Sequence, residues 1–224
     1  MTLPDHVTLT RLLQLASPAL PVGAYSYSQG LEAAIDAGIV RDEATTLGWI
    51  VDVLELTVSR MEAPLFLRLH RAWTADDEAA ARGWNDRLLA SRETAELRAE
   101  TAQMGYSLAR LLTALREPHP FEAWEDVSMP AVYTWWAARC DIDASSALVA
   151  YLWSWAENQV MAALKAVPLG QSAGQRVLFA LGSCIAEHAA RAKAVDDDSL
   201  GGLAPAFAIL SSRHETQYSR LFRS

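Results

Sequence analysis

Two stretches in the second half of the chain are apolar on every side of a helix, and they constrain the fold more than any other feature. Residues 144–166 have no charge in their first three turns, and Asp143 can cap their start. Residues 175–193 are similar, and Gly182 and Ser183 allow close approach of a neighbour. The large apolar residues are Leu148, Val149, Tyr151, Leu152, Trp153 and Trp155 in the first stretch, and Val177, Leu178, Phe179, Leu181, Cys184 and Ile185 in the second. Because a helix that is apolar all round is a buried helix, we expect both at the centre of an all-α, single-domain helical bundle.

Amphipathic helices are expected around this centre. From Leu47 to Met61, apolar residues recur with the 3.6-residue period of a helix, which Asp42 can cap. A second stripe runs from Leu97 to Leu115, and its other faces carry Arg98, Glu100 and Arg110, which we expect to be solvated. No stretch shows the sustained alternation of a strand, so no sheet is predicted.

Composition excludes several classes of protein. The 224 residues carry a net charge of −8, which argues against a nucleic-acid partner because such proteins need a basic face. The longest uncharged apolar stretch, Ala144 to Ala156, is shorter than the roughly 20 residues that cross a bilayer. Cys140 and Cys184 make no disulfide framework, and the N-terminus, with Asp5 and His6, lacks the basic-then-apolar pattern of a secretory signal. We therefore expect a cytoplasmic protein without a membrane partner.

Two proline- and glycine-containing segments interrupt the helical pattern. Residues 17–30 contain Ser26 and Gln29 at capping-box spacing, and Gly38 can close the helix expected there. Residues 165–176 repeat this chemistry, with Ser172 and Gln175 at the same spacing. Each segment is predicted to start a capped helix. Neither matches a phosphate loop, so capping is favoured over anion binding at either helix start.

The third unusual segment is the C-terminal tail, residues 213–224, which we separate from an all-helical domain of residues 1–212. The tail holds three Arg and one Glu, so it carries +2 against −10 for the remainder. A basic, aromatic tail on an acidic body is suited to docking, and the alternative is a frayed terminus. We expect it to add nothing to the core. Its ordering requires polar contacts to an acidic surface or to a partner, with Arg220 as the main contact and residues 25–28 as one acceptor.

Catalytic and metal sites are not predicted. The five His are scattered, and neither they nor the two Cys have metal-ligand spacing. Clustered His or Cys would be needed to store a transition-metal ion. We expect no catalytic residue, no metal site and no cofactor, with an enzyme whose site is assembled from distant residues as one alternative and a generic helical adaptor as another.

The three unusual segments resemble the UreF family of urease accessory proteins. The matching stretches are Leu12–Glu32, Lys165–Arg176 and His214–Arg223, and Ala24 stands where glycine is common in the family. The resemblance implies an all-α, non-catalytic scaffold that acts as a homodimer in a larger complex. It also implies three partners: UreD (also called UreH), the GTPase UreG, and urease apoprotein. Together these deliver Ni²⁺ and support carbamylation of the active-site lysine, and the scaffold modulates the UreG GTPase by activating or gating it.

The same three segments provide the candidate partner-binding residues. They are Tyr25, Ser26, Gln29, Lys165, Gln171, Ser172, Gln175, Arg176, His214, Glu215, Gln217, Tyr218, Arg220, Leu221 and Phe222. Arg176 and Arg220 are candidates for an arginine finger, although a structural role is commoner for such residues. The eight Trp are expected in the core, with Trp73 and Trp84 as alternatives at an interface.

Overall fold

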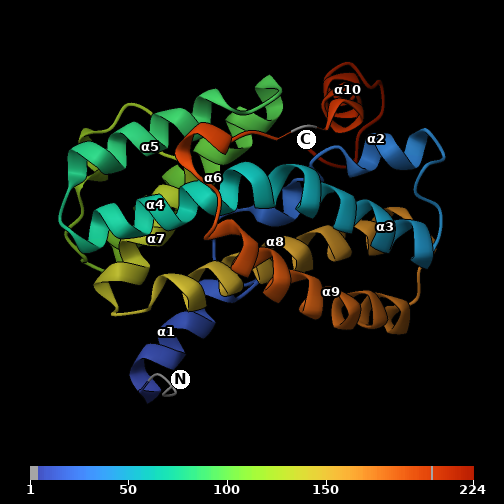
Figure 1. Cartoon of the computed structure of the whole chain (residues 1–224). Helices are drawn as coiled ribbons and strands as arrows, with labels where there is room; N and C mark the ends of the chain where they lie inside the picture. Colours follow the sequence, from blue (N-terminus) through green and yellow to red (C-terminus); the bar gives the residue numbers. More distant parts are fainter. Residues whose placement is uncertain (1–4, 203) are drawn as a thin grey trace.

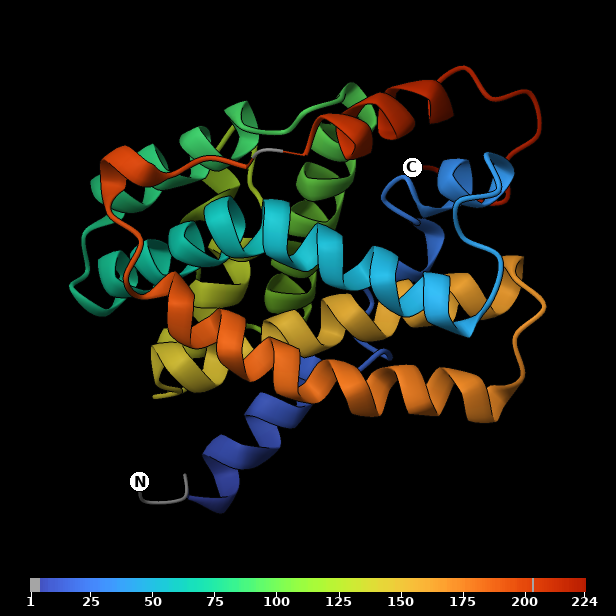
Figure 2. The ribbon, with the colours of Figure 1, turned by 45° about the vertical axis from the view of Figure 1, so that its right-hand side comes forward.

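The computed structural model describes residues 5–202 and 204–224, which form helices and no strand, so the predicted all-α class is confirmed. Figures 1 and 2 show the arrangement. The α-helices are α1 (His6–Ala16), α2 (Leu31–Asp36), α3 (Glu43–Val53), α4 (Ala63–Thr74), α5 (Glu78–Ala90), α6 (Ala95–Ala114), α7 (Met129–Arg139), α8 (Ala144–Ala166), α9 (Gln171–Ala192) and α10 (Pro205–His214). The other helical segments are η1 (Ala24–Ser26), η2 (Leu54–Glu62), η3 (Pro120–Ala123) and η4 (Asp197–Ser199).

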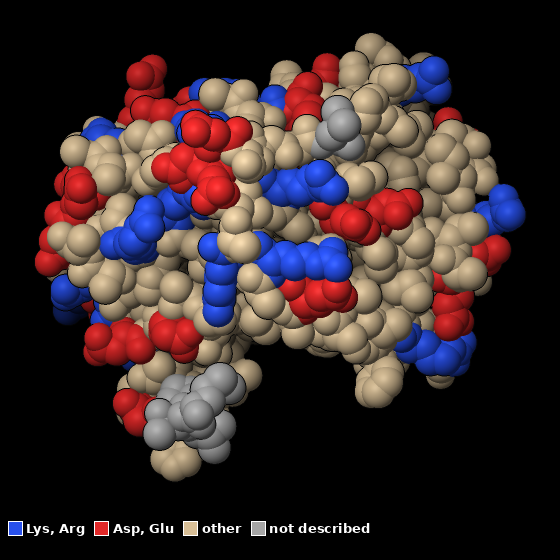
Figure 3. Space-filling view, in the orientation of Figure 1, with Lys and Arg blue, Asp and Glu red and all other residues tan. Residues whose placement is uncertain are grey.

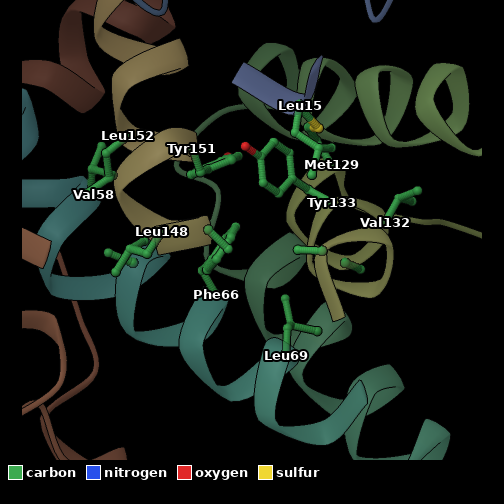
Figure 4. Close-up of a cluster of buried hydrophobic side chains, with 14 of the residues drawn as sticks. Leu15, Val58, Phe66, Leu69, Met129, Val132, Tyr133, Leu148, Tyr151 and Leu152 are labelled. Atoms are coloured by element: carbon green, nitrogen blue, oxygen red, sulfur yellow. The ribbon is translucent and has the colours of Figure 1, made fainter. Parts of the chain in front are cut away.

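Helix α7 forms the centre of the core, although the sequence interpretation did not single it out. Nine of its eleven residues are buried, and it packs against α4, α6 and α8. The ring of Tyr133 lies 5.7 Å from that of Phe66 on α4 and 5.3 Å from that of Tyr151 on α8 (Figure 4). Ser128 caps the helix and Pro130 occupies its first turn, so the local sequence favours a helix start there.

Helices α8 and α9 pack side by side, but only α8 matches its predicted start. Asp143 caps α8 as expected, accepting hydrogen bonds from the Ser145 and Ser146 amides. Helix α9 begins at Gln171 rather than Gln175, and Phe179 is 88% exposed. The prediction that α9 is buried on every side is therefore wrong. Its interior face packs on α8 and α3, while its outer face carries exposed polar and charged residues, among them Gln175, Arg176, Glu187 and Arg191.

Helices α3 and α4 are joined by η2, a π-helical stretch, into one long rod across the front of Figure 1. Asp42 and Thr45 form the capping box that starts α3, which confirms the predicted cap. Pro64 accounts for the wide turns of η2. Its ring crowds the carbonyl of Arg60, and proline has no N–H to donate to that carbonyl. The Arg60 carbonyl accepts instead from the Gly201 amide at 3.3 Å.

The two tryptophans considered for an interface differ in their burial. Trp73 is buried and donates to the Ala131 carbonyl at 3.0 Å, so it belongs to the core rather than to an interface. Trp84 is half-buried, with the Arg68 and Arg87 guanidiniums 5.6 and 5.9 Å from its ring. Charges of both signs are interspersed over the face shown in Figure 3. Within residues 5–202 and 204–224, each helix is too short or too polar to span a bilayer.

Helix α6 crosses the segment before α7 at Gly105, and this contact requires glycine. A Cβ atom at Gly105 would lie 2.1 Å from the Val127 carbonyl oxygen. We therefore expect Gly105→Ala to lower the free energy of unfolding by about 3 kcal/mol, because backbone must move to relieve the overlap. The control is Gly83→Ala in α5, where the new methyl meets open space and helix propensity favours alanine by about 0.5–1 kcal/mol. Urea unfolding of both variants measures the difference, and equal stabilities would contradict this packing.

Candidate partner-binding site

The C-terminal tail lies against the body of the protein. After α10 ends at His214, the chain returns beside α2 (Figure 2). The Arg223 amide donates to the Ser26 carbonyl at 2.8 Å, and the Ser28 amide donates to the Ser224 main-chain oxygen at 2.8 Å. The expected acceptor at residues 25–28 is therefore present. Phe222 is buried with Leu31, Val40 and other residues of α2 and α8, so the expectation that the tail adds nothing to the core is wrong.

Two carboxylates of the body hold the tail through polar contacts. Glu32 of α2 accepts from the amides of Leu221 and Phe222 at 2.6 and 2.9 Å. Glu96 of α6 accepts from the Arg220 guanidinium at 2.6 Å, which agrees with the main contact expected for that arginine. These bonds provide the acidic acceptors that the ordering of a basic tail requires.

His214 links the same two carboxylates. Its side chain is fully buried, with Nδ1 2.7 Å from Glu96 and Nε2 3.1 Å from Glu32. Each ring nitrogen therefore lies within hydrogen-bonding distance of a carboxylate oxygen from a different helix. The end of α10 is thereby fixed to both α2 and α6.

A second polar network lies beneath Ser224. Gln29 donates to Glu100 at 2.7 Å and accepts from the Trp155 indole N–H at 2.6 Å. The Ser224 hydroxyl donates to the other Glu100 oxygen at 2.7 Å. Burial raises the pKa of Glu100 to about 7, against the smaller opposing effect of these hydrogen bonds. The expected solvation of Glu100 is therefore wrong, because the tail and Gln29 cover it.

Gln29 adopts a left-handed backbone conformation with a φ of 53°, which is uncommon for a residue other than glycine. The predicted capping box of Ser26 and Gln29 does not form, since α2 begins at Leu31 after Gly30 and has no side-chain cap. Gln29 turns instead toward Glu100 and Trp155. Gly38, at a φ of 70°, closes α2 as predicted.

Lys165 of residues 165–176 contacts both residues 17–30 and the tail. It donates from Nζ to the Tyr25 carbonyl at 3.4 Å, and Nζ lies 5.7 Å from the ring centroids of both Tyr25 and Phe222. Its exposure agrees with the predicted reach of this side chain to solvent. Residues from three distant parts of the chain therefore share one surface.

An apolar groove adjoins this surface between residues 15–25 and α8. It has a volume of about 170 Å³, and Trp155 and Gln29 lie along it. Tyr25 is 69% exposed and Met161 is 44% exposed at its margin. Partial burial raises the pKa of Glu157, which also lines it. A groove with exposed apolar side chains and a few polar groups is suited to receive a side chain of a partner protein.

The remaining candidate residues divide between the tail and α9. The Tyr218 side chain is fully exposed and Leu221 is 61% exposed, so neither side chain helps to anchor the tail. Gln217 donates to the Ser219 carbonyl at 3.0 Å, and Glu215 accepts from the Glu96 amide at 3.3 Å. The tail is thus held by Phe222 and polar contacts, while its other large apolar side chains face outward.

The start of α9 differs from its prediction. Gln171, Ser172 and Gln175 are exposed within the helix, and Gly170 precedes it without a side-chain cap, so no capping box forms. Arg176 makes a two-point ion pair with Glu43 of α3, at 2.9 and 2.5 Å. These four residues extend away from the tail contacts rather than joining them.

Sequence reasoning missed the groups that receive the tail: Glu32, Glu96, Glu100 and Trp155. A basic tail implies acidic acceptors, but charge alone does not select these among the 27 acidic residues. Glu32 directly follows the first unusual segment, which was the one available signal. Among the described residues, no group of three or more His, Cys, Asp or Glu is placed to hold a metal ion.

Comparison with known proteins decides the family. A family model described as UreF matches residues 40–182. The chain belongs to the UreF family. The urease accessory protein UreF of Dechloromonas aromatica (strain RCB) is 54% identical over 222 residues, covering 96% of this chain and 97% of that protein. The UreF of Azoarcus sp. (strain BH72) is also 54% identical, over 96% of this chain and 95% of its own length.

A third relative has a different organisation. The bifunctional urease accessory protein UreEF of Bordetella bronchiseptica is 51% identical over 98% of this chain, which covers 53% of that longer protein. Membership of the UreF family supports a role in urease maturation, and the accessory name implies a role other than catalysis. The tail and the whole of the first segment lie outside residues 40–182, but the relatives extend over nearly the whole chain.

Proposed function

We propose that this chain is a non-catalytic cytoplasmic scaffold of urease maturation, and that UreD and UreG bind at the surface formed by Tyr25, Lys165 and the docked tail. The observation that carries the proposal is the exposure of Tyr218 and Leu221 on a tail that is otherwise fixed by hydrogen bonds. A fixed backbone lowers the entropy cost of binding, and exposed aromatic and aliphatic side chains supply its apolar contacts.

The partners act together on nickel as cargo. UreD, UreG and urease apoprotein assemble with this chain, which works as a homodimer in the complex, and Ni²⁺ reaches a urease site whose lysine is carbamylated. Arg176 and Arg220 are both engaged by carboxylates, at 2.5 and 2.6 Å. Their engagement supports gating of the UreG GTPase through complex assembly over direct insertion of an arginine finger.

The proposal is tested by co-purification. Tagged full-length chain is expressed with UreD and UreG, and both partners are expected to remain bound through gel filtration. A generic adaptor, or an enzyme with a site assembled from distant residues, needs neither partner. Loss of both partners from the tagged chain would reject the scaffold.

UreE is a second candidate neighbour. The relative named UreEF joins the two accessory functions in one polypeptide. Covalent linkage keeps two modules at high effective concentration, which is useful when they act on the same cargo. We infer that UreE acts close to this chain during nickel delivery, and crosslinking of UreE to the assembled complex would test this.

Lys165→Ala is expected to leave the fold unchanged and to weaken recruitment of UreG. The exposed ammonium makes one long hydrogen bond and two distant aromatic contacts, which together contribute no more than about 1 kcal/mol to stability. The second lysine of the chain, Lys193 at the end of α9, gives a matched control as Lys193→Ala. Thermal unfolding and UreG pull-down are measured for both. Equal UreG capture by the two variants would show that Lys165 is only a helix-end residue.

A further inference from the structure

A second groove lies between α6 and the segment of residues 117–127 and shares no lining residue with the tail-docking surface. Its volume is about 770 Å³. Four alanines of α6 line it, together with aromatic residues from both sides: Ala99, Ala102, Ala109, Ala114, Tyr106, Phe121 and Trp124. Tyr106 is 55% exposed. None of the described residues that line it is Leu, Ile or Met.

The length of the groove sets the length of an extended occupant. Ala99 and Ala114 are fifteen residues apart on one helix, which corresponds to about 22 Å at the rise of an α-helix. At about 3.3 Å per residue, six or seven residues of extended chain span this length.

The charge of the groove favours a cationic occupant. Its lining includes the exposed carboxylates of Glu122, Glu125 and Asp126 and a single cation, Arg110. Arg98 pairs with Asp126 at 2.7 Å, which leaves Glu122 and Glu125 available. Arg110 lies 6.0 Å from the Tyr106 ring. The excess of negative charge beside apolar walls complements a segment in which basic and aliphatic residues alternate.

His119 also lines the groove, and its Nε2 lies 2.9 Å from the Thr113 hydroxyl. The contacts that the groove offers to an occupant are therefore apolar and ionic.

We propose that this groove binds an extended cationic segment of a partner protein, six or seven residues long, in which Lys or Arg alternates with aliphatic residues. The alternation places basic side chains toward Glu122 and Glu125 and aliphatic ones toward the alanines, because successive side chains of an extended chain point to opposite sides. This surface is additional to the one proposed for UreD and UreG and does not depend on it.

The test uses a fluorescein-labelled peptide, Gly-Lys-Val-Arg-Val-Lys-Gly, and the full-length protein. Fluorescence anisotropy is expected to show saturable binding that weakens with salt, and no binding of the same peptide with Glu at the three basic positions. Glu122→Lys/Glu125→Lys should weaken binding about tenfold or more. The matched control, Asp196→Lys/Asp198→Lys, makes the same charge change on an exposed loop after α9 and should change binding less than about twofold.

A variant that blocks the groove without a change of charge separates the contribution of the groove from that of net charge. Ala102→Phe fills the groove without changing charge and should also weaken peptide binding about tenfold, with thermal unfolding as the check on folding. Three results would each overturn the proposal. They are no saturable binding to the wild-type protein, equal weakening by the two charge-reversal variants, and wild-type binding by a folded Ala102→Phe variant.

Discussion

Glu32→Gln is expected to release the tail and to lower the free energy of unfolding by about 3 kcal/mol. The Glu32 carboxylate accepts from two backbone amides of the tail and contacts the buried His214 ring. The glutamine side chain would instead present an N–H₂ donor to some of these groups. Removing the acceptor of buried N–H donors leaves these donors unsatisfied, which costs more than the hydrogen bonds contribute. Release of Phe222 from the core adds to the loss.

Urea unfolding and limited proteolysis measure this effect. The Glu32→Gln variant should be cleaved within residues 215–224 under conditions that leave the wild-type tail intact. Glu187→Gln is the matched control, because Glu187 makes an exposed pair with Arg191 one helical turn away and contributes only about 0.3–0.5 kcal/mol. If the two variants lose the same stability, Glu32 does not hold the tail.

The free energy of unfolding is expected to fall by about 3 kcal/mol between pH 4.5 and 7 because of Glu100. Its pKa is raised from 4.5 to about 7 in the folded protein by burial. In this window the folded protein keeps a proton that the unfolded chain has released, so stability decreases as pH rises and is lowest above pH 7. Each pKa unit corresponds to about 1.4 kcal/mol, which gives the stated magnitude.

Glu100→Gln isolates this contribution. The amide resembles the protonated acid in size and charge, and it can accept from Gln29 and donate to the Ser224 hydroxyl. The difference in unfolding free energy between variant and wild type should therefore grow from near zero below pH 4.5 to about 3 kcal/mol above pH 7. A difference that does not change with pH would mean that Glu100 titrates normally in the folded state.

Local sequence signals predicted α2, α3, α6, α8 and α9 but not the depth at which each lies, and they did not reveal α1, α4, α5, α7 or α10. Asp42 and Asp143 cap α3 and α8 because capping depends on neighbouring residues. Burial depends on which faces meet in the folded state. The apolar residues between Val177 and Ile185 made α9 look like a core helix, while the centre is α7, whose eleven residues were too few to stand out. The π-helical turns of η2 follow from Pro64 together with Gly201, which is 137 positions away, so no local pattern shows them.

The sequence identified the three segments that form the candidate site, but not the residues of the body that these segments contact. The convergence of Tyr25, Lys165 and the tail agrees with the three segments selected from sequence, although their binding role remains a prediction. The capping boxes of Ser26 and Ser172 were wrong because Gly30 and Gly170 start these helices. Glu96 and Glu100 lie more than one hundred residues from the tail groups that they bind, a distance over which a single sequence has no pairing signal.

The most direct test of the central claim is the affinity of purified UreD for a Tyr218→Ala/Leu221→Ala variant. Both side chains face solvent, so the variant should fold and unfold like the wild type. Isothermal titration calorimetry is expected to show binding weakened about thirtyfold or more, since hot-spot residues contribute about 2 kcal/mol or more. The control, Val7→Ala/Leu13→Ala, removes two similarly exposed apolar side chains from α1 and should bind as the wild type does. Wild-type affinity in the Tyr218→Ala/Leu221→Ala variant would contradict the account and make the docked tail a structural element alone.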